Sequence, residues 1–127
     1  SLNPNFVSAY VNRCAMYRKK GMYEEALNDA NESIERGGKE YPHYQRARVF
    51  MDLATSRDDP RMFKAIDDLT TAISYSKEPE SFLYENRGMC KFRSIGWNSA
   101  CEDFIIAKSL GADLAEFITK KMINGCN

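Results

Sequence analysis

Three arginines and three aspartates recur at fixed places in the sequence, where they could form either ion pairs or an acidic site. Each arginine precedes a small residue and each aspartate follows an alanine by three positions, the six being Arg13, Arg46, Arg87, Asp29, Asp68 and Asp103. A guanidinium group can donate to both oxygens of one carboxylate. Because the same types return in every unit, the pattern favours ion pairs that fix one element against the next.

The four cysteines and the single histidine, His43, offer little metal or nucleophilic chemistry. The cysteines are Cys14, Cys90, Cys101 and Cys126, and no two of them stand in a C-x-x-C spacing. A zinc site is therefore not expected, and nothing pairs a cysteine with His43 for catalysis. We predict that Cys14 is a small core residue. For Cys101 and Cys126, a disulfide and two buried thiols both remain open.

Adjacent acids occur at Glu24-Glu25, Asp58-Asp59 and Asp67-Asp68. Neighbouring residues on a helix do not face each other, so the first and third pairs are typical of solvated faces or helix ends. The sequence also contains no glycine-rich phosphate loop, nucleophile elbow or metalloprotease motif. We therefore predict no enzymatic activity, no catalytic or metal site, and no cofactor.

Charge and hydropathy exclude two further classes of partner. Lys plus Arg and Asp plus Glu are 18 each among 127 residues, so the formal net charge is zero. A protein that binds nucleic acid through its phosphates needs a clear basic surplus. No apolar run approaches the roughly 18 residues that indicate a membrane-spanning helix. We expect neither nucleic acid binding nor membrane insertion by this chain.

Helical patterns position the recurring residues. Tyr10, Cys14 and Tyr17 share one helical face before Gly21, and Tyr23, Ala26, Ala30 and Ser33 share one after it. The interval from the alanine of each second helix to the next small residue repeats as Ala26–Ser33, Ala65–Ala72 and Ala100–Ala107. The second unit carries an insert of about six residues around 55–59, which predicts a longer loop between its helices. Asp59-Pro60 then predicts a helix cap followed by proline at the first helical position.

These repeated helix-turn-helix units resemble the tetratricopeptide repeat, a unit of about 34 residues. The resemblance implies an all-α right-handed superhelix of three repeats, at about 7–39, 40–79 and 80–111, closed by a capping helix at about 112–123. Residues 1–6 resemble the tail of a preceding repeat, so the chain is interpreted as the C-terminal three-repeat fragment of a longer protein. Its C-terminal end resembles those of many bacterial repeat proteins.

In this family the first helices line a concave groove that binds peptides, which implies a scaffold for protein–protein interaction. Asn12, Gln45 and Asn86 fall in register and could read a peptide backbone. The predicted groove residues are Asn12, Arg18, Lys19, Tyr44, Gln45, Arg48, Met51, Asn86, Met89, Phe92 and Arg93. They make a mildly basic groove suited to a peptide or helix that combines acidic and apolar residues. Val11 and Ala15 stand where related co-chaperones hold a C-terminal carboxylate, so that clamp is not expected.

Two alternatives remain beside groove binding. The concave face could be merely solvated, with binding carried elsewhere. The repeats could also serve as a structural spacer or a self-association module of a larger multi-repeat protein, in which case the chain would form homo-oligomers.

Overall fold

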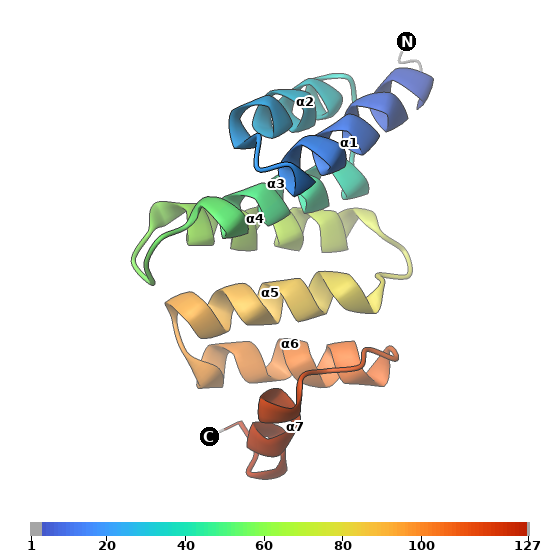
Figure 1. Ribbon diagram of the computed structural model, residues 1–127. Coiled ribbons are helices and arrows are strands. Elements are labelled where there is room, and N and C mark those ends of the chain that lie inside the picture. Colours follow the sequence, from blue (N-terminus) through green and yellow to red (C-terminus); the bar gives the residue numbers. More distant parts are fainter. Residues whose placement is uncertain (1–3, 127) are drawn as a thin grey trace.

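The computed structural model describes residues 4–126. In this range the chain forms the helices α1 (Pro4–Lys19), α2 (Tyr23–Glu35), α3 (Glu40–Leu53), α4 (Pro60–Tyr75), α5 (Ser81–Ser94), α6 (Trp97–Ser109) and α7 (Glu116–Ile123) (Figure 1). None of these helices has both the length and the apolar character that crossing a bilayer requires.

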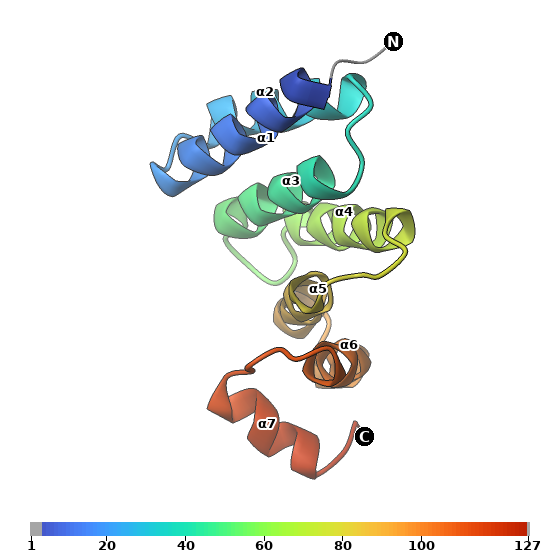
Figure 2. The same ribbon diagram turned by 90° about the vertical axis from the view of Figure 1, so that its right-hand side faces the viewer.

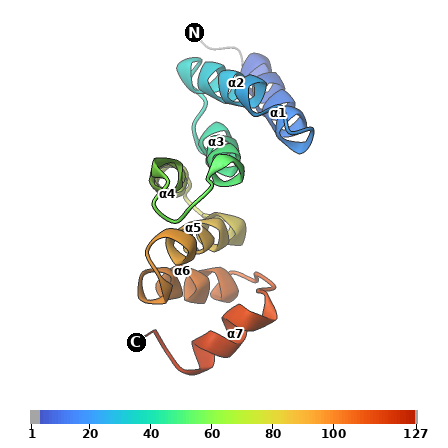
Figure 3. The ribbon, with the colours of Figure 1, turned by 60° about the vertical axis from the view of Figure 1, so that its left-hand side comes forward.

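The helices stack as three antiparallel pairs, α1 with α2, α3 with α4, and α5 with α6, and α7 covers the end of the stack (Figure 2). Successive pairs are rotated about the stacking direction, so that α5 is seen end-on where α1 is seen from the side. A third view shows the same progression from the α1–α2 pair to α7 (Figure 3). The predicted all-α right-handed superhelix of three repeats is confirmed.

Turn chemistry sets the three connections within the pairs. Gly21 adopts φ 76° between α1 and α2, a conformation that glycine reaches without steric cost. The loop between α3 and α4 spans residues 54–59 and is longer than its counterparts at 20–22 and 95–96, as the insert predicts. Asp59 caps α4, because its carboxylate accepts the backbone N–H groups of Arg61 at 2.9 Å and Thr55 at 3.0 Å. The hydrogen bonds from the Arg61 guanidinium, together with these two backbone bonds, hold the pKa of Asp59 well below its ordinary value.

Small residues at the helix crossings allow close packing inside each pair. Cys14, Ala26 and Ala30 are fully buried together with Val49, which reaches the first pair from α3. Similar clusters form around Ala47, Ala65 and Leu69 in the second pair and around Ala100 and Phe104 in the third. The core is therefore continuous along the stack, since each pair shares apolar contacts with the next.

The predicted arginine–aspartate pairs are confirmed in all three repeats. The guanidinium groups bind the carboxylates through two bonds each, at 2.7 and 2.7 Å for Asp29, 2.8 and 2.7 Å for Asp68, and 2.9 and 2.8 Å for Asp103. All three aspartates are buried. The hydrogen bonds to these aspartates raise the pKa of each arginine. Each pair joins the first helix of a repeat to the second, which is a structural role.

Both ends of the chain differ in detail from the expected boundaries. The first helix already includes Pro4 to Phe6 and so begins before residue 7, while residues 1–3 lie outside the described range. The last helix begins at Glu116, later than residue 112, because residues 112–115 cross the end of α6 in a non-helical conformation and bury Leu114 there. A Cys101–Cys126 disulfide and a hydrogen bond from Trp97 Nε1 to Gly125 O, at 3.1 Å, attach the final turn to α6.

Candidate functional site

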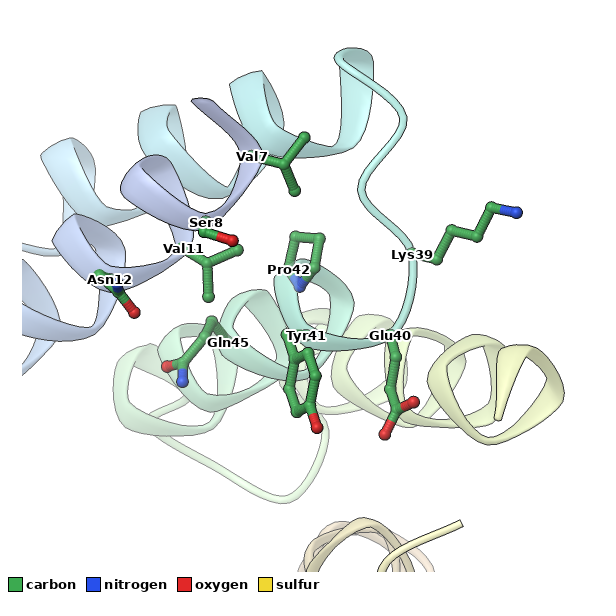
Figure 4. Close-up of a pocket in the computed structure, with 9 residues that line it drawn as sticks. All are labelled: Val7, Ser8, Val11, Asn12, Lys39, Glu40, Tyr41, Pro42 and Gln45. Atoms are coloured by element: carbon green, nitrogen blue, oxygen red, sulfur yellow. The ribbon is translucent and has the colours of Figure 1, made fainter. Parts of the chain in front are cut away.

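An open pocket of about 540 Å³ lies between the N-terminal halves of α1 and α3 (Figure 4). Its apolar walls come from Val7 and Val11 on one side and from Tyr41 and Pro42 on the other. The complete lining is Val7, Ser8, Val11, Asn12, Lys39, Glu40, Tyr41, Pro42 and Gln45. Because both walls are first helices of their repeats, the pocket lies on the surface that the sequence assigns to the groove.

Two of the three amide side chains predicted in register reach this pocket. Asn12 lies on α1 and Gln45 faces it from α3 (Figure 4). Gln45 Oε1 is buried and has no hydrogen-bond partner among the described residues. Asn86 differs, since its Nδ2 donates to Phe82 O on its own helix at 2.7 Å. The pocket therefore offers the exposed amide of Asn12, while Gln45 lines it with its Oε1 covered.

The rim of the pocket is fixed by Tyr41, whose hydroxyl donates to Glu80 Oε1 at 3.1 Å. This hydrogen bond raises the pKa of Tyr41, so the phenol stays protonated. The ring of Tyr41 is half exposed and lies beside Glu40. The rim thus places an aromatic face next to two carboxylates.

The predicted basic residues lie towards the C-terminal ends of the first helices and are not equivalent. Arg18 donates to Asp52 at 3.2 Å and is mostly buried, which neutralises its charge. Arg48 donates to the Tyr44 hydroxyl at 2.7 Å, and Arg93 is exposed with a long contact of 3.5 Å to Met51 O. Lys19 is exposed at the end of α1. The positive charge available to a ligand in α3 and α5 therefore belongs to Arg48 and Arg93.

Arg57 is a basic residue that sequence reasoning did not assign to the groove. It joins Arg93 in lining a second pocket of about 260 Å³ with Ala54, Thr55 and Ser56. Arg57 belongs to the loop inserted between α3 and α4. The insert itself is the sequence signal that could have identified this position, because a lengthened loop at the end of a first helix reaches the same surface.

The predicted apolar anchors are partly occupied by packing inside the protein. Tyr44 packs against Phe82 with ring centroids 4.8 Å apart, and Phe92 lies against Trp97 and Phe117 at 6.1 and 5.9 Å. Met51 and Met89 are half-buried against the second and third core clusters. These four side chains are therefore held by contacts within the protein and are not free to anchor a ligand. The open apolar surface is supplied by Val7, Val11, Tyr41 and Pro42.

The remaining thiols are buried away from this surface. Burial raises the pKa of Cys14 to about 11 and that of Cys90 to about 12. Both are therefore protonated and unreactive near neutral pH. Among the described residues no three His, Cys, Asp or Glu side chains gather in a way that could hold a metal ion.

Comparison with known proteins adds one finding. No family model matches the chain, and no curated protein matches it. Among solved structures, the first tetratricopeptide domain of Spaghetti (RPAP3), determined with the HSP90 peptide SRMEEVD, superposes with a TM-score of 0.80. The two are 16% identical, and the match covers 97% of this chain and 92% of that one. With its three stacked helix pairs and terminal helix, this chain has the tetratricopeptide-repeat fold.

Proposed function

We propose that this protein is a non-catalytic scaffold that binds an extended peptide segment of a partner protein across α1 and α3. The observation that carries the proposal is the pocket in which apolar walls surround the amide side chains of Asn12 and Gln45. An extended peptide has a free backbone N–H or C=O at every residue, and amide side chains can bond to both. The pocket satisfies those groups while burying apolar side chains of the ligand.

The charges around the groove indicate how such a peptide would lie. Glu40 and Glu80 flank the rim beside Tyr41, whereas Arg48, Arg57 and Arg93 gather towards the opposite ends of the helices. A ligand with acidic residues at one end and apolar residues at the other fits this polarity. Charge complementarity of this kind contributes chiefly to the association rate and to the choice of partner.

An internal segment suits the groove better than a free C-terminus. The solved neighbour carries a peptide in its complex, which supports peptide binding as the class of activity. In this chain Val11 and Ala15 replace the polar residues with which related co-chaperones hold a terminal carboxylate, and Val11 lines the pocket. We therefore expect SRMEEVD to bind this protein weakly or not at all.

The proposal is tested by selecting binders from a displayed library of random peptides and measuring their affinity for groove variants. We expect Gln45→Ala to weaken binding about fivefold, because one hydrogen bond to the ligand contributes about 1 kcal/mol. Arg48→Glu with Arg93→Glu should weaken binding further and remove most of its salt dependence.

Lys108→Glu on α6 is the matched control, since it changes an exposed charge on a second helix. It should leave the affinity unchanged, and each variant is first matched to the parent in thermal stability. If the selected peptides bind both groove variants as tightly as the parent, the groove is not the binding site and the proposal is wrong.

A further inference from the structure

The outer face of α1, formed by Phe6, Tyr10, Arg13 and Met16, is more exposed than the corresponding faces of α3 and α5. Alignment on the paired arginines places Met16 in register with Val49 and Cys90. Met16 is 57% exposed, whereas Val49 and Cys90 are both at 0%. Phe6 on the same face is 53% exposed. The sequence thus supplies an apolar side chain, Met16, at a position that the fold covers in the other two repeats.

The equivalent faces of α3 and α5 are covered by another helix, and they show which kind of helix fits the outer face of α1. The second helix of one repeat packs on the first helix of the next, as α2 does on α3 and α4 on α5. At each interface the paired arginine also donates backwards, Arg46 Nη1 to Asn31 at 3.0 Å and Arg87 Nη1 to Thr70 at 3.2 Å. Both acceptors stand two positions after the paired aspartate of their helix.

Arg13 makes the same two bonds to Asp29, but no acceptor from a preceding helix reaches it within residues 4–126. Its side chain is 56% exposed, against 26% for Arg46 and 17% for Arg87. Beside it lies a hollow of about 240 Å³ lined by Phe6, Ala9, Tyr10 and Arg13. The outer face of α1 therefore has the side chains that form the first-helix side of the α2–α3 and α4–α5 interfaces, but no second helix packs on it within residues 4–126.

We propose that the outer face of α1 docks the second helix of a further helix pair, stacked in the same sense as the pairs in the structure. That helix carries the chemistry of α2 and α4, with small apolar residues facing α1 and an amide or hydroxyl oxygen that accepts from Arg13. Its docking adds another first helix beside Val7 and Ser8 and so lengthens the groove. The inference concerns a different surface from the peptide pocket and is independent of the proposed function.

A second copy of this chain does not fit the face. In a twofold arrangement Arg13 would meet Arg13, and two guanidinium groups offer each other no acceptor. The exposed helix α6 has Ile105 at the position of Asn31 and Thr70, so it lacks the acceptor too. The helices α2 and α4, which have it, are already covered by α3 and α5.

The experiment adds the chain's own first repeat to that face. Residues 1–38 are joined directly to Phe6, so that Arg13 and Met16 follow the added α2 with the spacing that Arg46 and Val49 have from α2. The added copy carries Met16→Leu and Met22→Leu, so that Met16 and Met22 of the parent repeat are each unique. We expect a single unfolding transition whose urea midpoint lies above that of the parent chain, because stacked repeats unfold cooperatively.

Two further measurements separate docking from mere tethering. Peroxide should oxidise Met16 readily in the parent and several-fold more slowly in the extended chain, while Met22, 40% exposed, reacts at the same rate in both. Met16→Asp should leave the parent's midpoint unchanged and abolish the rise in the extended chain. Separate transitions for the added repeat, or equal oxidation of Met16 in the two chains, would overturn the proposal.

Discussion

At the scale of single residues, Gly88 is a position where α5 lies tightly against the Phe104 ring of α6. A Cβ atom on Gly88 would stand 2.9 Å from Phe104 Cε1 and 3.0 Å from Cδ1. Phe104 cannot easily withdraw, since it is fully buried and stacks on Trp97 with ring centroids 5.8 Å apart. The corresponding positions in the other repeats hold Cys14 and Ala47. Of these three positions, the one in the third repeat has no side chain.

We predict that Gly88→Ala lowers the free energy of unfolding by about 1 kcal/mol. Overpacking a buried site costs about 1–3 kcal/mol, and the better helix propensity of alanine returns about 1 kcal/mol of that. Urea unfolding followed by circular dichroism measures the difference.

A double-mutant cycle with Phe104→Leu provides the control for this prediction. The smaller side chain should make Gly88→Ala cheaper, so the two effects should not add. An identical cost of Gly88→Ala in both backgrounds would show that contact with Phe104 is not the cause.

Residue types with a repeating spacing could be predicted from the sequence, whereas their individual partners could not. The arginine–aspartate pairs follow from a pattern that returns three times. The neutralisation of Arg18 by Asp52 does not repeat and joins two helices through tertiary packing. The same holds for Tyr44, whose packing against Phe82 depends on how α3 and α5 meet. The sequence therefore predicted which side chains lie on the first helices, but it overstated the charge and the apolar surface that those side chains leave free.

At the scale of elements, α7 depends on the Cys101–Cys126 bond more than on its own packing. It is short, Phe117 and Ile123 on it are exposed, and of its residues Ile118 is the buried one. The bond closes a loop with a sequence separation of 25 residues. Closing a loop of that size stabilises a folded chain by about 3 kcal/mol in the chain-entropy account.

We predict that Cys126→Ser lowers the free energy of unfolding by about 3 kcal/mol and frees α7 from α6. Denaturant unfolding gives the first quantity, and proteolysis between residues 111 and 126 gives the second. A reducing agent should produce the same loss in the parent chain and none in Cys126→Ser. A parent chain whose stability is unchanged by reduction would contradict the prediction.

Element boundaries were predicted where local chemistry decides them. The longer loop of the second repeat and the Asp59-Pro60 start of α4 depend on residues within a few positions of each other. The start of α7 depends instead on Leu114 reaching the cluster around Phe104, a contact that no local pattern encodes. The disulfide was left open for the same reason, since it requires the end of the chain to return to α6.

At the scale of the whole molecule, each helix packs chiefly on its neighbours in the sequence, with α1 on α3 as the main further contact. Stability in such a stack is a sum of repeat and interface contributions. The fold could therefore be predicted as a whole from three similar units. The number of repeats that stack on α1 could not be predicted in the same way, because a first helix has the same sequence pattern whether or not another helix covers its outer face.

We predict that protection from hydrogen exchange is greatest in α3, α4 and α5 and decreases towards α1. The central helices are covered on both sides of the stack, whereas α1 has an open outer face. Local opening then requires the loss of one interface at α1 and of two in the middle. Native-state exchange measured by mass spectrometry provides the test. Equal protection in α1 and α5 would indicate one undivided cooperative unit.

The bond between Cys101 and Cys126 also gives the molecule a mechanical character. In a stack of this kind a tensile load applied through the two ends passes through the helices in series. Under such a load the bond carries the force directly from α6 to the last residues, and the segment between the two sulfur atoms bears none. At roughly 3.4 Å per residue, a separation of 25 removes about 85 Å from the extensible contour. Tension therefore loads α1 to α5 and the first residues of α6, whereas the segment between Cys101 and Cys126, which includes the rest of α6 and all of α7, is shielded from it.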